Sequence, residues 1–92
     1  MEQRKDLEDI IKHYGREHQQ LKAVEEMAEL TQAIAKHLNA DDPIGPTLEN
    51  VKEELADVKV MVDQLLIIYG EDNVLEIVKE KIERQKVRML NE

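Results

Sequence analysis

The fold is decided by residues 21–38, which read LKAVEEMAELTQAIAKHL. Apolar side chains recur every three or four positions through this stretch, and in a helix that spacing places them on one continuous arc. Charged residues such as Lys22, Glu25, Glu29 and Lys36 occupy the other side. The pattern predicts a long amphipathic helix from about residue 17 to residue 39. Its apolar arc consists of Leu21, Val24, Met27, Ala28, Thr31, Ile34, Ala35 and Leu38.

Three further helices are predicted, because the few glycines and prolines of the chain fall where helices would end. Gly15 and Gly70 each follow a helical run, as residues just past a helix often do. Thr47 is expected to cap the third helix, and Asn73 is expected to cap the fourth in a capping box. The sequence therefore predicts an all-α fold with four helices in a single domain over residues 1–92. Besides the long helix, the expected ranges are 4–14, 47–69 and 73–89.

A chain of 92 residues has a thin core of its own. The third predicted helix carries the expected apolar stripe, but Val60, Met61, Ile67 and Ile68 add apolar surface on other sides of its second half. Only three other helices are present to cover that surface. The sequence thus predicts self-association.

Composition excludes several classes of function. With 21 acidic residues against 13 basic ones, the formal charge is −8, which disfavours a nucleic-acid partner. The absence of cysteine removes disulfides, thiol nucleophiles and cysteine-ligated zinc. No apolar run approaches the ~20 residues of a membrane span, and the first residues are too charged for a signal peptide. We therefore expect a cytoplasmic protein that binds neither nucleic acid nor a membrane.

Two short segments are near copies of each other: Glu25-Glu26-Met27-Ala28-Glu29-Leu30 and Glu53-Glu54-Leu55-Ala56-Asp57-Val58. Residues three apart are neighbours on a helix, and like charges at that spacing repel. If the two long helices pack antiparallel, as their short connection favours, all six carboxylates should face one another. These six are Glu25, Glu26, Glu29, Glu53, Glu54 and Asp57.

The carboxylates have two readings, either solvated faces of two Glu-rich helices or a site for bound cations. The second is favoured because the acidic face of the third helix continues into Met61 and Ile68, which are not solvent residues. Several carboxylates without a thiol suit Mg²⁺, or Mn²⁺ in its place. The Glu-x-x-His spacing of di-iron bundles is absent, since Ile10, Gly15 and Ile34 precede the three histidines at that distance.

The last predicted helix carries the opposite charge. Lys81, Arg84 and Arg88 share one face, which suits the oxygens of a polyphosphate. The alternative is that these cations only complement the helix dipole near its C-terminus.

The pair Glu26-x-x-Glu29 and Glu54-x-x-Asp57, with the segment from Glu53 to Val58 and the basic run from Lys81 to Arg88, resembles the MazG-like all-α nucleotide pyrophosphohydrolases. The resemblance implies a helical bundle completed by dimerisation, or a dimer of dimers. It also implies Mg²⁺-dependent hydrolysis of nucleoside triphosphates to the monophosphate and pyrophosphate. The roles it implies are metal ligands (Glu26, Glu29, Glu54, Asp57), activation of the attacking water (Glu25 or Glu53) and binding of the pyrophosphate (Lys81, Arg84, Arg88).

Two alternatives stay open. Phosphoribosyl-ATP pyrophosphatase resembles the chain in length and carboxylate spacing, although its second motif usually reads Glu-Ala-Ala-Asp. A non-enzymatic acidic bundle could instead bind metal or nucleotide, or serve as an adaptor, without turnover. Aromatic residues are limited to Tyr14 and Tyr69, each typical of packing at a helix end, so the sequence predicts no base preference.

Overall fold

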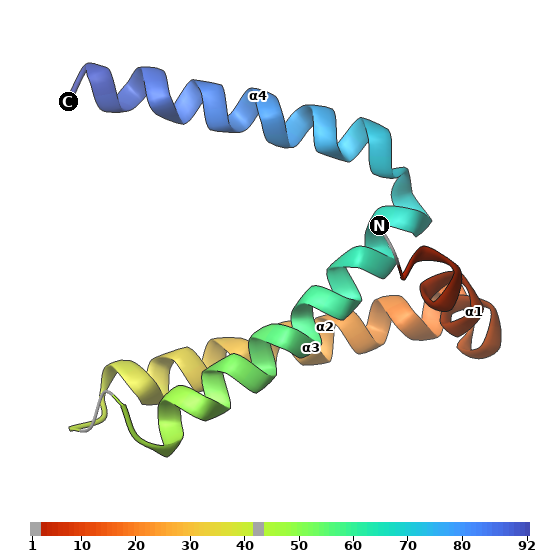
Figure 1. Ribbon diagram of the computed structural model, residues 1–92, viewed down its shortest axis with the longest axis horizontal. Helices are drawn as coiled ribbons and strands as arrows, with labels where there is room; N and C mark the ends of the chain where they lie inside the picture. Colours follow the sequence, from red (N-terminus) through yellow and green to blue (C-terminus); the bar gives the residue numbers. More distant parts are fainter. Residues whose placement is uncertain (1–2, 42–43) are drawn as a thin grey trace.

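The computed structural model describes residues 3–41 and 44–92, and within these ranges every element is a helix (Figure 1). This confirms the predicted all-helical class and the four helices. All the predicted ends lie within two residues of the observed ones. The helices are α1 (Arg4–Tyr14), α2 (Arg16–Leu38), α3 (Pro46–Tyr69) and α4 (Glu71–Leu90).

Glycines with positive φ lie at two of the three junctions between helices, and both were predicted to follow a helix. Gly15 lies between α1 and α2 with φ of 98°, and Gly70 lies between α3 and α4 with φ of 105°. A side chain is strained in this region, so glycine suits both turns. The predicted capping box at Asn73 is wrong, because Gly70 already reverses the backbone and α4 begins at Glu71 with no side-chain cap.

The prediction that Thr47 caps α3 is also wrong. Gly45 is the N-cap residue, Pro46 occupies the first helical position, and Thr47 lies inside the helix. Proline suits that position because its fixed φ is helical and the missing N–H would have no partner there. The Thr47 hydroxyl instead lies 3.0 Å from Nδ1 of His37 at the end of α2.

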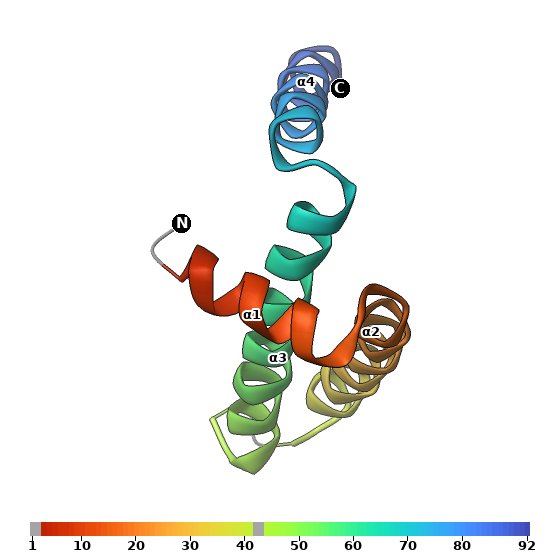
Figure 2. The same ribbon diagram turned by 90° about the vertical axis from the view of Figure 1, so that its right-hand side faces the viewer.

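The two long helices pack side by side and antiparallel, as expected from their short connection (Figures 1 and 2). Polar contacts mark the register from one end of the pair to the other, since residue numbers rise on α3 as they fall on α2. α1 packs across one end of the pair and buries Leu7 and Ile11. The polar contacts between α2 and α3 are His37 with Thr47 at 3.0 Å, Gln19 with Gln64 at 2.8 Å, and Arg16 with the Ile68 carbonyl at 3.0 Å.

The apolar arc of α2 does not form the core of this chain. The residues that α2 buries are Gln19, Ala23, Glu26 and Ala33, which recur at multiples of about one helical turn on a different face. Leu21, Val24 and Leu38 of the predicted arc are 62%, 66% and 77% exposed. α2 thus places a narrow face of small and polar residues against α3 and leaves its broader apolar arc open.

α4 diverges from the α2–α3 pair (Figures 1 and 2). Within the described residues it contacts α3 and, through its first residue Glu71, Arg4 of α1, and it buries none of its side chains. The radius of gyration is 16.3 Å, whereas a compact domain of this length would have about 12 Å. The accessible surface is 7331 Å², against about 5,500 Å² for a folded monomer of this mass. The single chain is therefore open, with a surplus of exposed surface.

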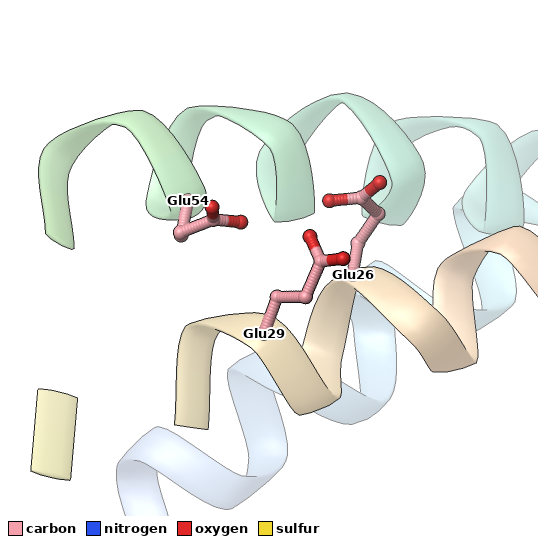
Figure 3. A group of neighbouring side chains, drawn as sticks. All are labelled: Glu26, Glu29 and Glu54. Carbon is pink, nitrogen blue, oxygen red and sulfur yellow. The ribbon is translucent and has the colours of Figure 1, made fainter. Parts of the chain in front are cut away.

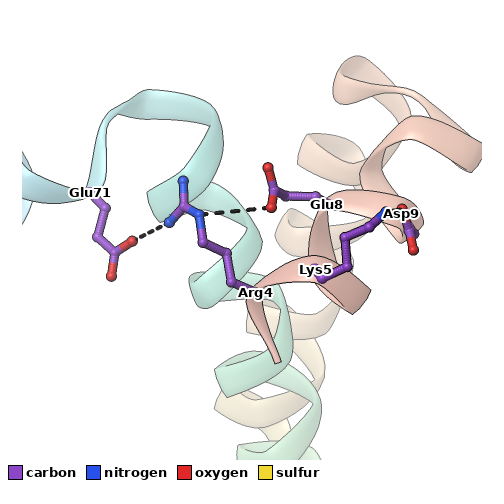
Figure 4. Close-up of polar contacts among 5 residues, drawn as sticks. All are labelled: Arg4, Lys5, Glu8, Asp9 and Glu71. Carbon is purple, nitrogen blue, oxygen red and sulfur yellow. Dashed lines mark hydrogen bonds and ion pairs between the residues drawn. The ribbon is translucent and has the colours of Figure 1, made fainter. Parts of the chain in front are cut away.

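Ion pairs of Arg4 connect the start of α4 to α1 (Figure 4). Its guanidinium lies 2.5 Å from a carboxylate oxygen of Glu71 and 3.8 Å from one of Glu8. Both pairs lie at the surface, with the Arg4 side chain 45% exposed, so each contributes no more than about 1 kcal/mol.

The Gln19–Gln64 pair generates a stability prediction. Both amides are buried, with Gln64 1% exposed, and each is the other's partner. Gln64→Leu should lower the free energy of unfolding by about 1 to 3 kcal/mol, because the Gln19 amide loses its acceptor. The double variant Gln19→Leu/Gln64→Leu should recover most of that loss. Urea unfolding followed by circular dichroism measures both, and a double variant no more stable than Gln64→Leu alone would contradict the account.

Candidate metal centre

Three carboxylates meet where α2 and α3 pack together (Figure 3). One oxygen from each of Glu26, Glu29 and Glu54 lies within 4.8 Å of the others. Glu26 and Glu29 are neighbours because they are three residues apart on α2, and the antiparallel packing brings Glu54 of α3 opposite them. We call these three residues the carboxylate cluster.

Two oxygens of the cluster are buried without a hydrogen-bond partner. Glu26 is only 7% exposed, and its Oε2 atom, like Oε2 of Glu54, has no donor. The other oxygen of Glu26 lies 3.2 Å from the Lys22 ammonium. Buried carboxylate oxygens without partners are costly, because the hydration they lose is not replaced. Among the described residues, Lys22 is the one cation that pairs with the cluster, so a single positive charge stands against three carboxylates.

Two pKa shifts also indicate that the carboxylate cluster lacks positive charge. The carboxylates of Glu26 and then Glu54 raise the pKa of Glu29 above its ordinary value, because each disfavours a further negative charge beside it. On the opposite side, the hydrogen bond to Glu26 and its charge raise the pKa of Lys22. A cation among the three carboxylates would relieve the repulsion on Glu29.

The cluster can hold a metal ion. It offers oxygen ligands alone, which are the ligands of hard divalent cations, and it draws them from two helices rather than from a flexible loop. Three protein ligands leave other coordination positions for water or for the oxygens of a bound molecule.

The cluster is smaller than predicted. Of the six carboxylates expected to face one another, the structure brings together Glu26, Glu29 and Glu54, whereas Glu25, Glu53 and Asp57 do not belong to this group. Asp57 is exposed because it comes one position before Val58, which is partly covered on the side of α3 that packs. Glu25 and Glu53 are exposed for the same reason, since each is rotated about 100° from the neighbouring cluster residue.

The basic residues of α4 lie apart from the cluster within this chain. Lys81, Arg84 and Arg88 are all exposed, and α4 has no contact with α2 among the described residues. Lys81 and Arg84 line a shallow pocket of about 190 Å³ together with Ile77 and Glu80. Any joint action of these cations with the cluster requires a second subunit or a movement of α4.

Lys22 is a site residue that sequence analysis missed. Its charge predicts a place on the solvated side of α2, and the residue is exposed, but its ammonium lies 3.2 Å from Glu26 and 3.9 Å from Glu25. The available signal was its spacing of four residues from Glu26, which places the two side chains together on a helix.

No protein-family model, curated protein or solved structure matches this chain. Among the helices that the structure describes, none is long and apolar enough to cross a membrane.

The shift of Glu29 generates a prediction for metal-free protein in EDTA. Its raised pKa means that the folded protein binds this proton more tightly than the unfolded chain does. Stability therefore falls as the pH rises from about 4.5 through the raised pKa. Glu29→Gln should melt at a higher temperature than the wild type at pH 7, and the difference should vanish below about pH 4.

Thermal melts between pH 3.5 and 8, followed by circular dichroism, test this. The matched control is Glu49→Gln, because Glu49 is an exposed carboxylate on α3 whose one ion pair among residues 3–41 and 44–92 is with Lys52 at 3.4 Å. A Glu29→Gln variant less stable than the wild type at pH 7 would show that the repulsion is absent.

Proposed function

We propose that this protein is a metal-dependent nucleoside triphosphate pyrophosphohydrolase that converts a nucleoside triphosphate to its monophosphate and pyrophosphate. The observation that carries the proposal is the carboxylate cluster, which joins one acidic motif on α2 to its near copy on α3 and contains two buried oxygens without a donor. The resemblance of these motifs to MazG-like proteins supports the reaction assigned. Mg²⁺ is the cation proposed, with Mn²⁺ as a substitute, and the cytoplasm is the proposed location.

The chemistry assigns different roles to different residues. A divalent cation at the cluster would neutralise phosphate charge and lower the pKa of a bound water. Glu26, Glu29 and Glu54 would hold the cation, and Asp57 would join them only after its side chain turned inward. Glu25 and Glu53 flank the cluster and are exposed, so either can accept a proton from water.

The exposed surface supports a dimer as the working unit. The apolar arc of α2 and the stripe of Leu75, Val78 and Ile82 on α4 are both uncovered in the single chain. The surface in excess of that of a compact monomer exceeds the ~800 Å² that each partner buries in a standard interface. A second copy would cover this surface. It could also bring Lys81, Arg84 and Arg88 of its α4 to the cluster, where they would bind phosphate oxygens.

Pyrophosphate release from a panel of ribo- and deoxyribonucleoside triphosphates tests the reaction. With Mg²⁺, the wild type should release pyrophosphate and no orthophosphate. Glu54→Gln should lower kcat/KM for the best substrate by about 100-fold or more, because the metal loses a ligand. Glu49→Gln, which changes an exposed carboxylate about one and a half turns away on the same helix, should retain activity.

Other outcomes would redirect the assignment. Turnover of phosphoribosyl-ATP alone would identify the histidine-biosynthesis enzyme. Metal binding without turnover of any of these substrates would indicate a binding protein or adaptor. Activity that survives Glu54→Gln would contradict the proposed site.

The oligomeric state has its own test by sedimentation velocity. Val24→Glu places a charge in the exposed apolar arc of α2, and it should shift the protein from dimer or tetramer to smaller species because a buried unpaired charge is costly. Lys36→Glu alters a charged residue outside the arc and should leave the assembly intact. A wild-type monomer at micromolar concentration would contradict the proposed dimer.

A further inference from the structure

Lys22 is the cation that the chain itself supplies to the carboxylate cluster. Its ammonium lies 3.2 Å from an oxygen of Glu26 and 3.9 Å from an oxygen of Glu25. No other basic side chain in the described part of the chain forms an ion pair with a cluster residue. Lys22 comes four residues before Glu26, so it reaches the cluster from the same face of α2.

This ion pair differs from those on the open surface. The side chain of Glu26 is 10% exposed, the least of any carboxylate in the ion pairs of residues 3–41 and 44–92, whereas the side chain of Lys22 is 47% exposed. The ammonium thus meets a largely covered carboxylate from the solvent side. Salt screens such a pair less than it screens fully exposed pairs.

The ammonium neutralises only part of the cluster. It contacts Oε1 of Glu26, whereas Oε2 of the same carboxylate and Oε2 of Glu54 are buried without a donor. The pKa of Lys22 is raised first by the hydrogen bond to Glu26 and by the charge of that residue, and further by the charges of Glu25 and Glu29. The Lys22 charge therefore offsets some of the repulsion among the carboxylates in the metal-free protein.

A divalent cation in the cluster would be repelled by the same ammonium. A cation held by Oε2 of Glu26 at about 2.1 Å would lie about 6 Å from the ammonium on the other oxygen. At that separation, a double and a single positive charge repel each other enough to weaken binding about tenfold, even at the dielectric constant of water.

We infer that Lys22 is a built-in competitor of the metal: its ammonium stabilises the empty carboxylate cluster and lowers the affinity of the cluster for a divalent cation. The inference rests on the proposed function, because it concerns the metal site on which that function depends. The opposing role for Lys22 is to hold Glu26 so that Oε2 faces the metal, as partners of metal ligands often do. The two roles predict opposite effects when the charge of Lys22 is removed.

Calorimetric titration of the metal-free protein with Mn²⁺, in about 0.02 M and about 0.5 M KCl, tests the inference. Lys22→Met keeps an unbranched side chain without the charge, and it should bind Mn²⁺ about 10-fold more tightly than the wild type at low salt. The gain should shrink at high salt, because ions screen the repulsion. Lys22→Arg, which keeps the charge, should bind within about threefold of the wild type.

Metal-free thermal melts in EDTA add a second measurement. Lys22→Met should melt at a lower temperature than the wild type, because Glu26 loses its counter-ion. If this variant does not fold without metal, Lys22→Gln replaces it, since glutamine removes the charge and keeps a hydrogen-bond donor. The matched control is Lys36→Met, which removes an exposed charge from the same helix about two turns beyond Glu29. Its Mn²⁺ affinity should stay within about twofold of the wild type.

Unchanged or weaker Mn²⁺ binding by the folded neutral variant overturns the inference. The metal site itself stands in that case, provided that the wild type binds Mn²⁺ and Glu26→Gln does not. Absence of saturable binding by both the wild type and the neutral variant overturns the inference and the proposed metal site together.

Discussion

The antiparallel pairing of α2 with α3 is the constraint on which the rest of the structure depends. Its register is fixed at both ends by polar contacts, of which the buried Gln19–Gln64 amide pair is the most enclosed. That register determines which residues of α3 lie opposite Glu26 and Glu29, and it selects Glu54. It also brings Gln19 of α2 and Met61 of α3 together in the lining of one pocket. A shift of one residue would rotate Glu54 by about 100° and separate the three carboxylates.

The contact between α2 and α3 buries little apolar surface, and this explains the open shape of the chain. α2 buries small and polar residues against α3, including a carboxylate, and so gains little hydrophobic stabilisation from this contact. The large apolar side chains of α2 and α4 are left exposed. A cation at the cluster and a second subunit over the apolar arc would each supply stability that the isolated chain lacks, so metal binding, assembly and folding should be linked.

Sequence reasoning recovered the helices because glycine positions and apolar spacing are local properties. It failed at Thr47 and Asn73, where a neighbouring proline and a positive-φ glycine started the helix earlier than the polar side chain suggested. The sequence could not show which face of α2 packs against α3. Both the apolar arc and the face of small and polar residues repeat at helical spacing, and the outcome depends on the surface that α3 offers. The same uncertainty affected the site. Spacing alone placed Glu26 beside Glu29, whereas the inclusion of Glu54 and the exclusion of Asp57 depend on the register between two helices.

The central claim is that Glu26, Glu29 and Glu54 hold a divalent cation. Electron paramagnetic resonance of Mn²⁺ titrated into the protein tests it without reference to turnover, since bound ions lose the sharp signal of the free ion. The account predicts saturable binding by the wild type and by Glu49→Gln, and loss of that binding in Glu26→Gln. Equal binding by Glu26→Gln and the wild type, or no saturable binding by the wild type, would contradict it.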